Sequence, residues 1–137
     1  MDSENDWLYY FGARYRTNGS MDAYYDYNRY IITKFKLPTL DNPNVILTAE
    51  DVIEQFTTEY DINVTQGGTL FNNHIYHTYG FGNSTYPSAI RVFDLKTRCL
   101  SSKIDLSFIQ EELESCAVYN GKLYVSTVSS KIYELTF

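Results

Sequence analysis

The sequence predicts an all-β fold assembled from a repeated unit of four short antiparallel strands. The prediction depends on an internal repeat that matches one hairpin with another, and on an apolar segment that recurs around both. The stretch GTLFNNHIYHTY aligns with CAVYNGKLYVST, so that Leu70 matches Val118 and Tyr76 matches Tyr124. In each copy a short apolar strand meets a tight turn and returns as an alternating strand.

A two-residue turn lies at the centre of each copy. Asn120-Gly121 is the preferred pair for a type I′ turn, because both central residues need a positive φ angle. Asn72-Asn73 is the next best substitute, since Asn tolerates that conformation. Both copies are therefore predicted to be β-hairpins.

A second alignment places YIITKFKLP, AIRVFDLKT and KIYELTF together, with Ile32, Ile90 and Ile132 in register. The segments NVILTAEDVIEQF and SSKIDLSFIQEEL correspond in the same way. In chain order, the patterns predict strands at Trp7–Phe11, Arg29–Leu37, Asn44–Thr48, Gly67–Phe71, His74–Tyr79, Ala89–Leu95, Leu100–Leu106, Ser115–Tyr119, Lys122–Thr127 and Lys131–Phe137.

Four short strands per unit, repeated at roughly 42 to 58 residues, are typical of β-propeller blades. The predicted architecture is a single partial propeller of about two and a half blades over residues 1–137. Its parts are a blade remnant at about 7–56, a blade at about 62–107 and an incomplete blade at about 113–137. The outer blades each lack one strand, so we expect open edges and large apolar faces, covered by missing blades or by self-association.

The patterns NGKLYV and AIRVFDLKT resemble the broad group of bacterial propellers with kelch-like, six-bladed and quinoprotein-like repeats. The Gly-Gly pair of kelch repeats occurs at Gly67-Gly68 and is replaced by Ser115-Cys116 in the next copy. The resemblance implies a propeller fold and, by analogy, a periplasmic or cell-surface location for the parent protein.

Charge and composition exclude several classes of partner. The chain has 17 Asp plus Glu against 11 Lys plus Arg, so its field repels phosphate backbones and no nucleic-acid partner is expected. No apolar run approaches the roughly 18 residues that span a bilayer, and the start, MDSENDW, is acidic where a secretory signal is basic. We therefore expect no membrane insertion. In the absence of a phosphate-binding glycine motif, no cofactor is expected either.

The connections between the second and third strands of a blade lie on one face of a propeller, where ligands usually bind. Two of them, GARYRTNGSMDAYYDYN and GFGNSTYPS, are rich in Tyr, Asn, Ser and Gly, as antibody loops are. In the alternative interpretation, the tyrosines cover the top of the sheet and pack against other blades. For recognition of a protein or glycan we predict Arg14, Tyr15, Arg16, Tyr24, Tyr25, Tyr27 and Tyr86.

The chain has two histidines and two cysteines. His74 and His77 are three residues apart on a predicted strand and should point to opposite faces, so no metal site is predicted. Cys99 and Cys116 are too few for a disulfide scaffold and are predicted to be small buried side chains.

Two acidic stretches, AEDVIEQF and QEELES, precede the first strands of the second and third units. Their pattern favours a short helical turn with Val52, Ile53 and Phe56 on the apolar side and carboxylates in solvent. The acidic residues in question are Glu50, Asp51, Glu54, Glu111, Glu112 and Glu114.

A catalytic alternative depends on a second resemblance. The stretch YHTYGFGNSTYPSAIRVFDLKT, followed by Glu114 before CAVYNGKLYV, resembles plant-type glutamine cyclotransferase propellers. The resemblance implies a propeller enzyme of cyclotransferase or hydrolase type with Glu114 as acid/base, a role that requires burial of the carboxyl group. The Glu-Gly pair of that family is Glu114-Ser115 here, and the earlier copy has Gln66. The main prediction is therefore a non-catalytic binding protein.

Overall fold

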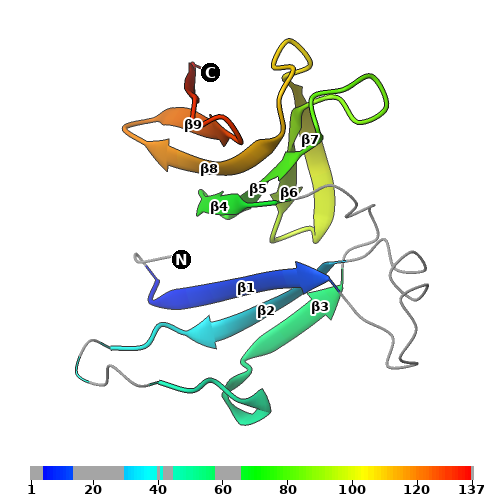
Figure 1. Ribbon diagram of the computed structural model, residues 1–137. Coiled ribbons are helices and arrows are strands. Elements are labelled where there is room, and N and C mark those ends of the chain that lie inside the picture. The colour runs from blue at the N-terminus through cyan, green and yellow to red at the C-terminus, as the bar shows by residue number, and fades with distance from the viewer. Residues whose placement is uncertain (1–4, 14–29, 40, 42–44, 58–65, 137) are drawn as a thin grey trace. The chain divides into compact units, whose positions relative to one another are not determined.

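A computed structural model of the chain contains three antiparallel β-sheets (Figure 1). It describes residues 5–13, 30–39, 41, 45–57 and 66–136, and these include no α-helix. The predicted all-β class is confirmed. No helix in these segments could cross a membrane. The chain divides into two compact units, residues 1–62 and 63–137, each of which is described by itself.

The strands follow the predicted order with one exception. Both predicted hairpins are present, and the third strand of each repeated unit begins within a few residues of its predicted start. The elements are β1 (Trp7–Ala13), β2 (Tyr30–Lys36), η2 (Ala49–Asp51), β3 (Glu54–Thr57), β4 (Gly68–Phe71), β5 (His74–Tyr79), β6 (Ala89–Asp94), β7 (Cys99–Asp105), β8 (Leu113–Tyr119), β9 (Lys122–Thr127) and β10 (Ile132–Leu135).

The exception lies in the first unit, whose sheet has the order β1-β2-β3. The strand predicted at 44–48 is wrong, because the strand that pairs with β2 comes later, as β3. Thr48 instead caps the 3-10 helix η2: its Oγ1 accepts a hydrogen bond from the Glu50 N–H at 3.3 Å. The Asp51 carboxylate accepts one from the Thr48 N–H at 2.8 Å. This capping box forms a turn at the end of the segment that the apolar pattern predicts as a strand. The predicted helical turn is present as η2, but without its apolar side, because Ile53 is exposed and Phe56 lies in β3.

The second unit holds two sheets, one with the order β4-β5-β6-β7 and one with the order β10-β9-β8. The first is the complete four-stranded unit that the repeat predicts, with Ile75 opposite Phe93. The other contains the first three strands of the same unit, with Leu123 opposite Leu135. The first strands of the two sheets, β4 and β8, are neighbours (Figure 1).

Both hairpin turns have the predicted conformation. The φ angles are 47° at Asn72 and 58° at Asn73, and 48° at Asn120 and 72° at Gly121. Positive φ at both central positions is what a type I′ turn requires. The turn residues therefore set the register of both hairpins.

A cluster of buried side chains fills the space between the two sheets of the second unit. Tyr76, Ile104, Tyr133 and Leu135 pack against the edge of this cluster. Since each such buried apolar side chain contributes roughly 1.5–3 kcal/mol, the cluster is the main interaction that holds the two sheets together. Its members are Ile90, Val92, Leu106, Ile109, Leu113, Cys116, Leu123 and Val125.

The outer face of the β8–β10 sheet carries both polar and apolar side chains. On β9, the buried residues alternate with Lys122, Tyr124 and Ser126. Glu134 of β10 accepts hydrogen bonds from Lys122 Nζ at 2.5 Å and from the Tyr124 hydroxyl at 3.0 Å. In the repeat alignment Glu134 takes the place of Val92, which is buried. The same face carries Ile132 and Tyr119, which are 73% and 67% exposed. The expected apolar face is therefore interrupted in this sheet by a hydrogen-bonded ion pair.

Candidate functional site

Three connections of the second unit meet at one end of its two sheets, and two of them are the green and yellow-orange loops of Figure 1. Ser88 Oγ donates a hydrogen bond to the Glu111 carbonyl oxygen at 2.8 Å. The Val128 N–H donates one to the Glu112 carbonyl oxygen at 3.0 Å. Because each connection is bonded to the next, we treat them as one surface. This loop platform consists of residues 80–88, 106–112 and 128–131.

The Glu111 side chain binds the platform together. Its carboxylate accepts hydrogen bonds from Thr127 Oγ1 at 2.7 Å, from Ser129 Oγ and from Lys131 Nζ. The hydrogen bond from Lys131, followed by those from Ser129 and Thr127, lowers the pKa of Glu111 from 4.5 to about 2. Glu111 is therefore an anion at neutral pH, and its hydrogen bonds connect the β7–β8 connection to the β9–β10 turn.

Gly82 allows the 80–88 connection to approach Glu111 closely. Its φ is +71°, and a Cβ atom at this position would overlap the backbone of Gln110 and Glu111. Only glycine satisfies both requirements, a left-handed conformation and the absence of a side chain. The contact fixes two of the platform's connections against each other at the level of their backbones.

The 80–88 connection is also ordered from within. Asn83 Oδ1 accepts hydrogen bonds from the backbone N–H groups of Thr85 at 3.0 Å and Tyr86 at 2.8 Å. The Phe81 N–H donates to the Tyr86 carbonyl oxygen at 2.9 Å, and the two rings meet edge to face with their centroids 5.7 Å apart. The Asn-Ser-Gly composition thus forms a rigid turn around an aromatic pair.

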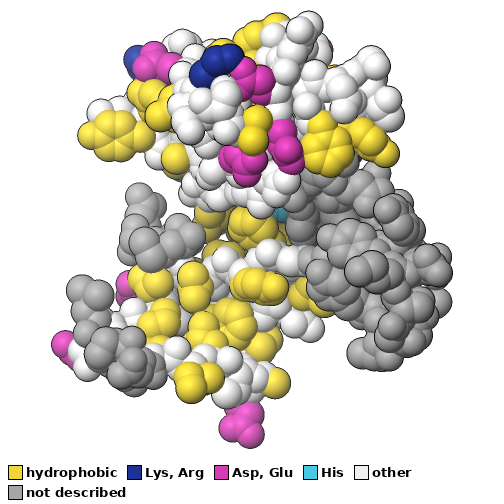
Figure 2. Space-filling model, viewed as in Figure 1, with side chains coloured by type: hydrophobic (Ala, Val, Ile, Leu, Met, Phe, Trp, Pro, Cys, Tyr) yellow, Lys and Arg dark blue, Asp and Glu magenta, His cyan; other side chains and the backbone are white. Residues whose placement is uncertain are grey.

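Apolar side chains project from this rigid frame into solvent. The exposed fractions are 43% for Phe81, 66% for Phe108 and 60% for Val128, one from each connection. Figure 2 shows hydrophobic side chains at the surface of the second unit beside acidic ones. Exposed aromatic side chains on a preorganised frame are typical of recognition surfaces.

Of the residues predicted for recognition, the structure describes Tyr86, which is half-buried against Phe81. Phe81 and Phe108 are exposed on the platform but are not among the residues that the sequence pattern predicts. The signal that could have found them is position: both lie in connections that reach the same end of the sheets. The other predicted residues lie outside the described segments: Arg14, Tyr15, Arg16, Tyr24, Tyr25 and Tyr27.

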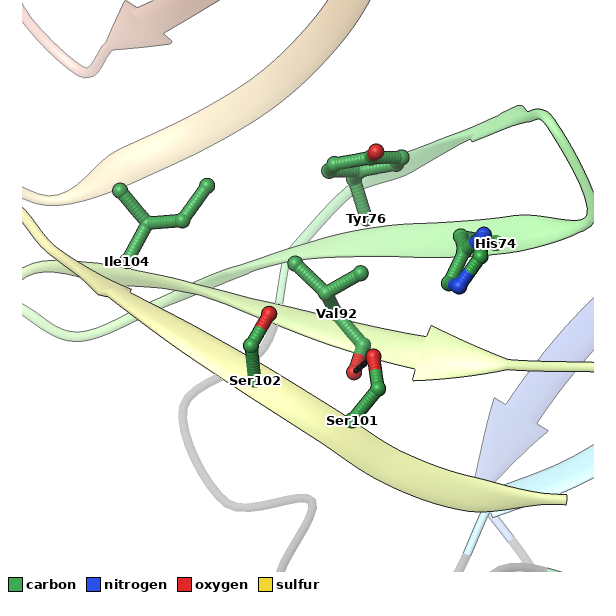
Figure 3. Close-up of a pocket in the computed structure, with 6 residues that line it drawn as sticks. All are labelled: His74, Tyr76, Val92, Ser101, Ser102 and Ile104. Atoms are coloured by element: carbon green, nitrogen blue, oxygen red, sulfur yellow. Dashed lines mark hydrogen bonds between the residues drawn. The ribbon is translucent and has the colours of Figure 1, made fainter. Parts of the chain in front are cut away.

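A shallow groove of about 330 Å³ lies elsewhere, on the face of the β4–β7 sheet (Figure 3). An aromatic ring, two aliphatic side chains and two hydroxyl groups form most of its surface. Ser101 Oγ donates to the Val92 carbonyl oxygen at 3.0 Å, where the β6–β7 register shifts. The groove is lined by His74, Tyr76, Val92, Ser101, Ser102 and Ile104.

His74 in this groove uses both ring nitrogens toward its own chain. Nδ1 lies 2.7 Å from the Asn72 carbonyl oxygen, which can only accept, so Nδ1 carries a proton. Nε2 lies 3.9 Å from Asp94 Oδ2. Backbone N–H groups of Thr97 and Lys96 lower the pKa of Asp94. His74 therefore faces an anion on the neighbouring strand, since Asp94 is its partner in the β5–β6 register.

The two histidines point to opposite faces of β5, as predicted. His74 lines the groove, whereas His77 is fully buried on the other face. Burial, with a smaller effect of the Arg91 charge, lowers the pKa of His77 to about 3. In the described part of the chain, no three His, Cys, Asp or Glu side chains are grouped as a metal site would require.

The cysteines differ from each other in burial. Cys116 is buried, its thiol donates to the Tyr76 carbonyl oxygen at 3.3 Å, and burial raises its pKa to about 12. Cys99 is exposed at the start of β7. The prediction that both are buried is therefore wrong for Cys99, because β7 is the outer strand of its sheet.

The acidic stretch before β8 forms no helical turn, so that prediction is wrong for this copy. Glu111 binds the platform, and Glu112 accepts a hydrogen bond from Gln66 Nε2. Glu114 lies where the β8–β9 register shifts and has an exposed side chain. The acid/base hypothesis for Glu114 depends on a buried carboxyl group, and Glu114 lacks that burial.

Comparison with known proteins adds no relative to these observations. No protein-family model matches the chain, and no curated protein or solved structure matches it either.

Proposed function

We propose that this protein is a binding module that recognises a protein or a glycan through the loop platform. The observation that carries the proposal is the set of hydrogen bonds at Glu111. The carboxylate joins the β7–β8 connection to the β9–β10 turn, and the carbonyl oxygen accepts a hydrogen bond from Ser88 of the third connection. Phe81 and Phe108 remain exposed on this frame. A surface that is already ordered loses little conformational entropy when a ligand binds, so more of the contact energy becomes affinity.

Binding is favoured over catalysis because the central carboxylate of the platform, Glu111, already accepts hydrogen bonds from neighbouring side chains. Glu111 accepts three hydrogen bonds, and a pKa of about 2 makes it a poor proton acceptor at neutral pH. The Glu111 carboxylate therefore lacks the matched pKa that a general base needs.

In this proposal the three sheets are successive propeller-type blades. The order β4-β5-β6-β7 and the adjacency of β4 and β8 support it, because the first strands of neighbouring blades lie together. The platform then corresponds to the face where propeller ligands bind. The Tyr-rich connection between β1 and β2, which includes Tyr24, Tyr25 and Tyr27, remains a prediction for the same surface.

The proposal is tested with the double variant Phe81→Ala/Phe108→Ala on an array of glycans and a peptide library. We expect ligands of the native protein to bind the double variant at least roughly tenfold more weakly, as loss of aromatic anchors does. Tyr119→Ala is the matched control, since Tyr119 is 67% exposed at the hairpin end of β8. Equal losses in both variants, or none in the double variant, would contradict the proposal.

A further inference from the structure

The groove on the β4–β7 sheet changes in chemical character along its length. Strand pairing forms its middle row, in which Tyr76 lies opposite Val92 and Val92 lies opposite Ser102. Ile104 follows this row on β7 and His74 precedes it on β5, so the two lie at opposite ends of the groove (Figure 3). One end is therefore aliphatic, the middle is lined by an aromatic ring, and the other end is lined by an imidazole ring.

The imidazole end of the groove brings two hydrogen-bond acceptors together. The His74 Nδ1–H is donated to the Asn72 carbonyl oxygen at 2.7 Å, so in the neutral ring Nε2 has a lone pair. Nε2 lies 3.9 Å from Asp94 Oδ2, which is longer than a hydrogen bond. Hydrogen bonds from the backbone N–H groups of Thr97 and Lys96 lower the pKa of Asp94, so its carboxylate is ionised at neutral pH. In the neutral form of His74, a lone pair and an anionic oxygen therefore face each other.

The serine hydroxyl beside this end is also an acceptor. Ser101 Oγ donates its proton to the Val92 carbonyl oxygen at 3.0 Å, so its remaining capacity is to accept. The His74 and Asp94 side chains are 35% and 22% exposed, so both are open to a small molecule. A group that donates several hydrogen bonds and carries a positive charge matches this end of the groove, because hydrogen bonds between charged groups are the strong ones.

We infer that the groove binds a small arylalkylamine, whose ammonium group lies between His74 Nε2 and Asp94 Oδ2. An ammonium group has three N–H donors and can satisfy both acceptors at once. The volume of about 330 Å³ is at the lower end of the range for small-molecule sites, so it suits a single ring on a short carbon chain. The net charge of −6 of the chain favours the approach of a cation and opposes that of an anion.

The rest of the groove fits the ring of such a ligand. Neighbouring rows on one face of a sheet are about 7 Å apart along the strands. A short carbon chain on the ammonium group therefore brings the ring to the middle row, where Tyr76 offers an aromatic partner and Val92 an aliphatic one. This inference does not depend on the loop platform, because His74 begins β5 and the 80–88 connection follows the other end of that strand.

The test measures binding of phenethylamine to the native protein by isothermal titration calorimetry and by NMR titration of the backbone amides. Phenethyl alcohol is the matched neutral probe, since it differs from the amine in its head group alone. We expect the amine to bind roughly tenfold or more tightly than the alcohol, because its hydrogen bonds are charge-assisted. The amide shifts should centre on Tyr76, Val92 and Ser102. Absence of binding, equal affinities or shifts centred elsewhere would overturn the inference.

Butylamine tests the role of the ring. It has the same ammonium group on an aliphatic chain like that of a lysine side chain. We expect it to bind roughly fivefold or more weakly than phenethylamine, because it leaves the Tyr76 ring without an aromatic partner. Equal affinity of the two amines would mean that the groove recognises the ammonium group alone, as it would on a lysine of another protein, and the assigned ligand class would be wrong.

Three variants of the protein locate the contact. Asp94→Asn removes the charge and keeps an oxygen that can accept from the adjacent N–H groups, so the preference for the amine over the alcohol should be lost. Glu114→Gln removes an exposed carboxylate outside the groove and should keep the preference. Ser102→Leu places a larger side chain in the middle row and should weaken binding of both probes. A preference that survives Asp94→Asn, or binding that Ser102→Leu leaves unchanged, would contradict the site.

Discussion

The two hairpin turns of the second unit have different residues at the second of their two central positions. Asn73 and Gly121 occupy equivalent positions with φ of 58° and 72°. Because the left-handed conformation is strained for any residue with a Cβ atom, Asn73→Gly should raise the free energy of unfolding by up to about 1 kcal/mol. Urea denaturation of the native and variant proteins measures the change. The reverse substitution, Gly121→Asn, should lower stability, and a loss on Asn73→Gly would contradict the assignment.

Glu111 gives the protein a defined dependence on pH. Its folded-state pKa of about 2 is below the ordinary 4.5, so its stabilising effect is fully present above about pH 4.5 and is lost as pH falls through about 2. Glu111→Gln should therefore destabilise the protein at neutral pH, and the difference from the native protein should shrink between pH 4.5 and 2.

The measurement is thermal unfolding of both proteins across that range. Glu114→Gln is the control, because Glu114 is an exposed carboxylate outside the network. A difference between Glu111→Gln and the native protein that stays constant down to pH 2 would rule out the ionised network as its cause.

Among the connecting elements, the 80–88 connection offers a test of close packing that is separate from backbone strain. Gly82 and Gly121 have nearly the same φ, 71° and 72°, but a Cβ atom at Gly82 meets the backbone of Glu111 and one at Gly121 meets nothing within 4 Å. Both Ala variants carry the conformational cost of about 1 kcal/mol, and only Gly82→Ala adds a steric overlap. We expect Gly82→Ala to be the more destabilising in urea denaturation, and equal losses would show that the contact is unimportant.

The elements that could be predicted from the sequence are those with local signals. Asn-Gly and Asn-Asn turns between alternating segments identified both hairpins, and the recurring isoleucine identified β2, β6 and β10. The strand β3 was misplaced because its alternation is weak, with half-buried Glu54 and Phe56, whereas the stronger apolar pattern upstream precedes a capped turn. Contacts between connections, such as Gly82 with Glu111, involve residues distant in sequence, and no local pattern encodes them.

At the scale of the whole molecule, the two thiols report separately on surface and core. Cys99 is exposed, and Cys116 is buried with its pKa raised to about 12. A thiol reagent at about pH 8 should modify Cys99 at once and Cys116 only when the core opens, because the thiolate is the reactive form. The absorbance of the leaving group released from the reagent gives the rates of modification of Cys99 and of Cys116. The Cys99→Ser variant should show the slow phase without the fast one. A fast reaction of that variant would contradict the burial of Cys116.

The Lys122–Glu134 pair has a consequence for any surface that covers the outer face of the β8–β10 sheet. Such a surface takes the pair out of water, and buried ions without further hydrogen-bond partners are strongly destabilising. The corresponding face of the β4–β7 sheet has Val92 in place of Glu134 and is covered by apolar side chains of the β8–β10 sheet. A surface that covers the β8–β10 sheet in its turn therefore needs polar groups opposite the pair, and an apolar copy of the existing interface would not serve.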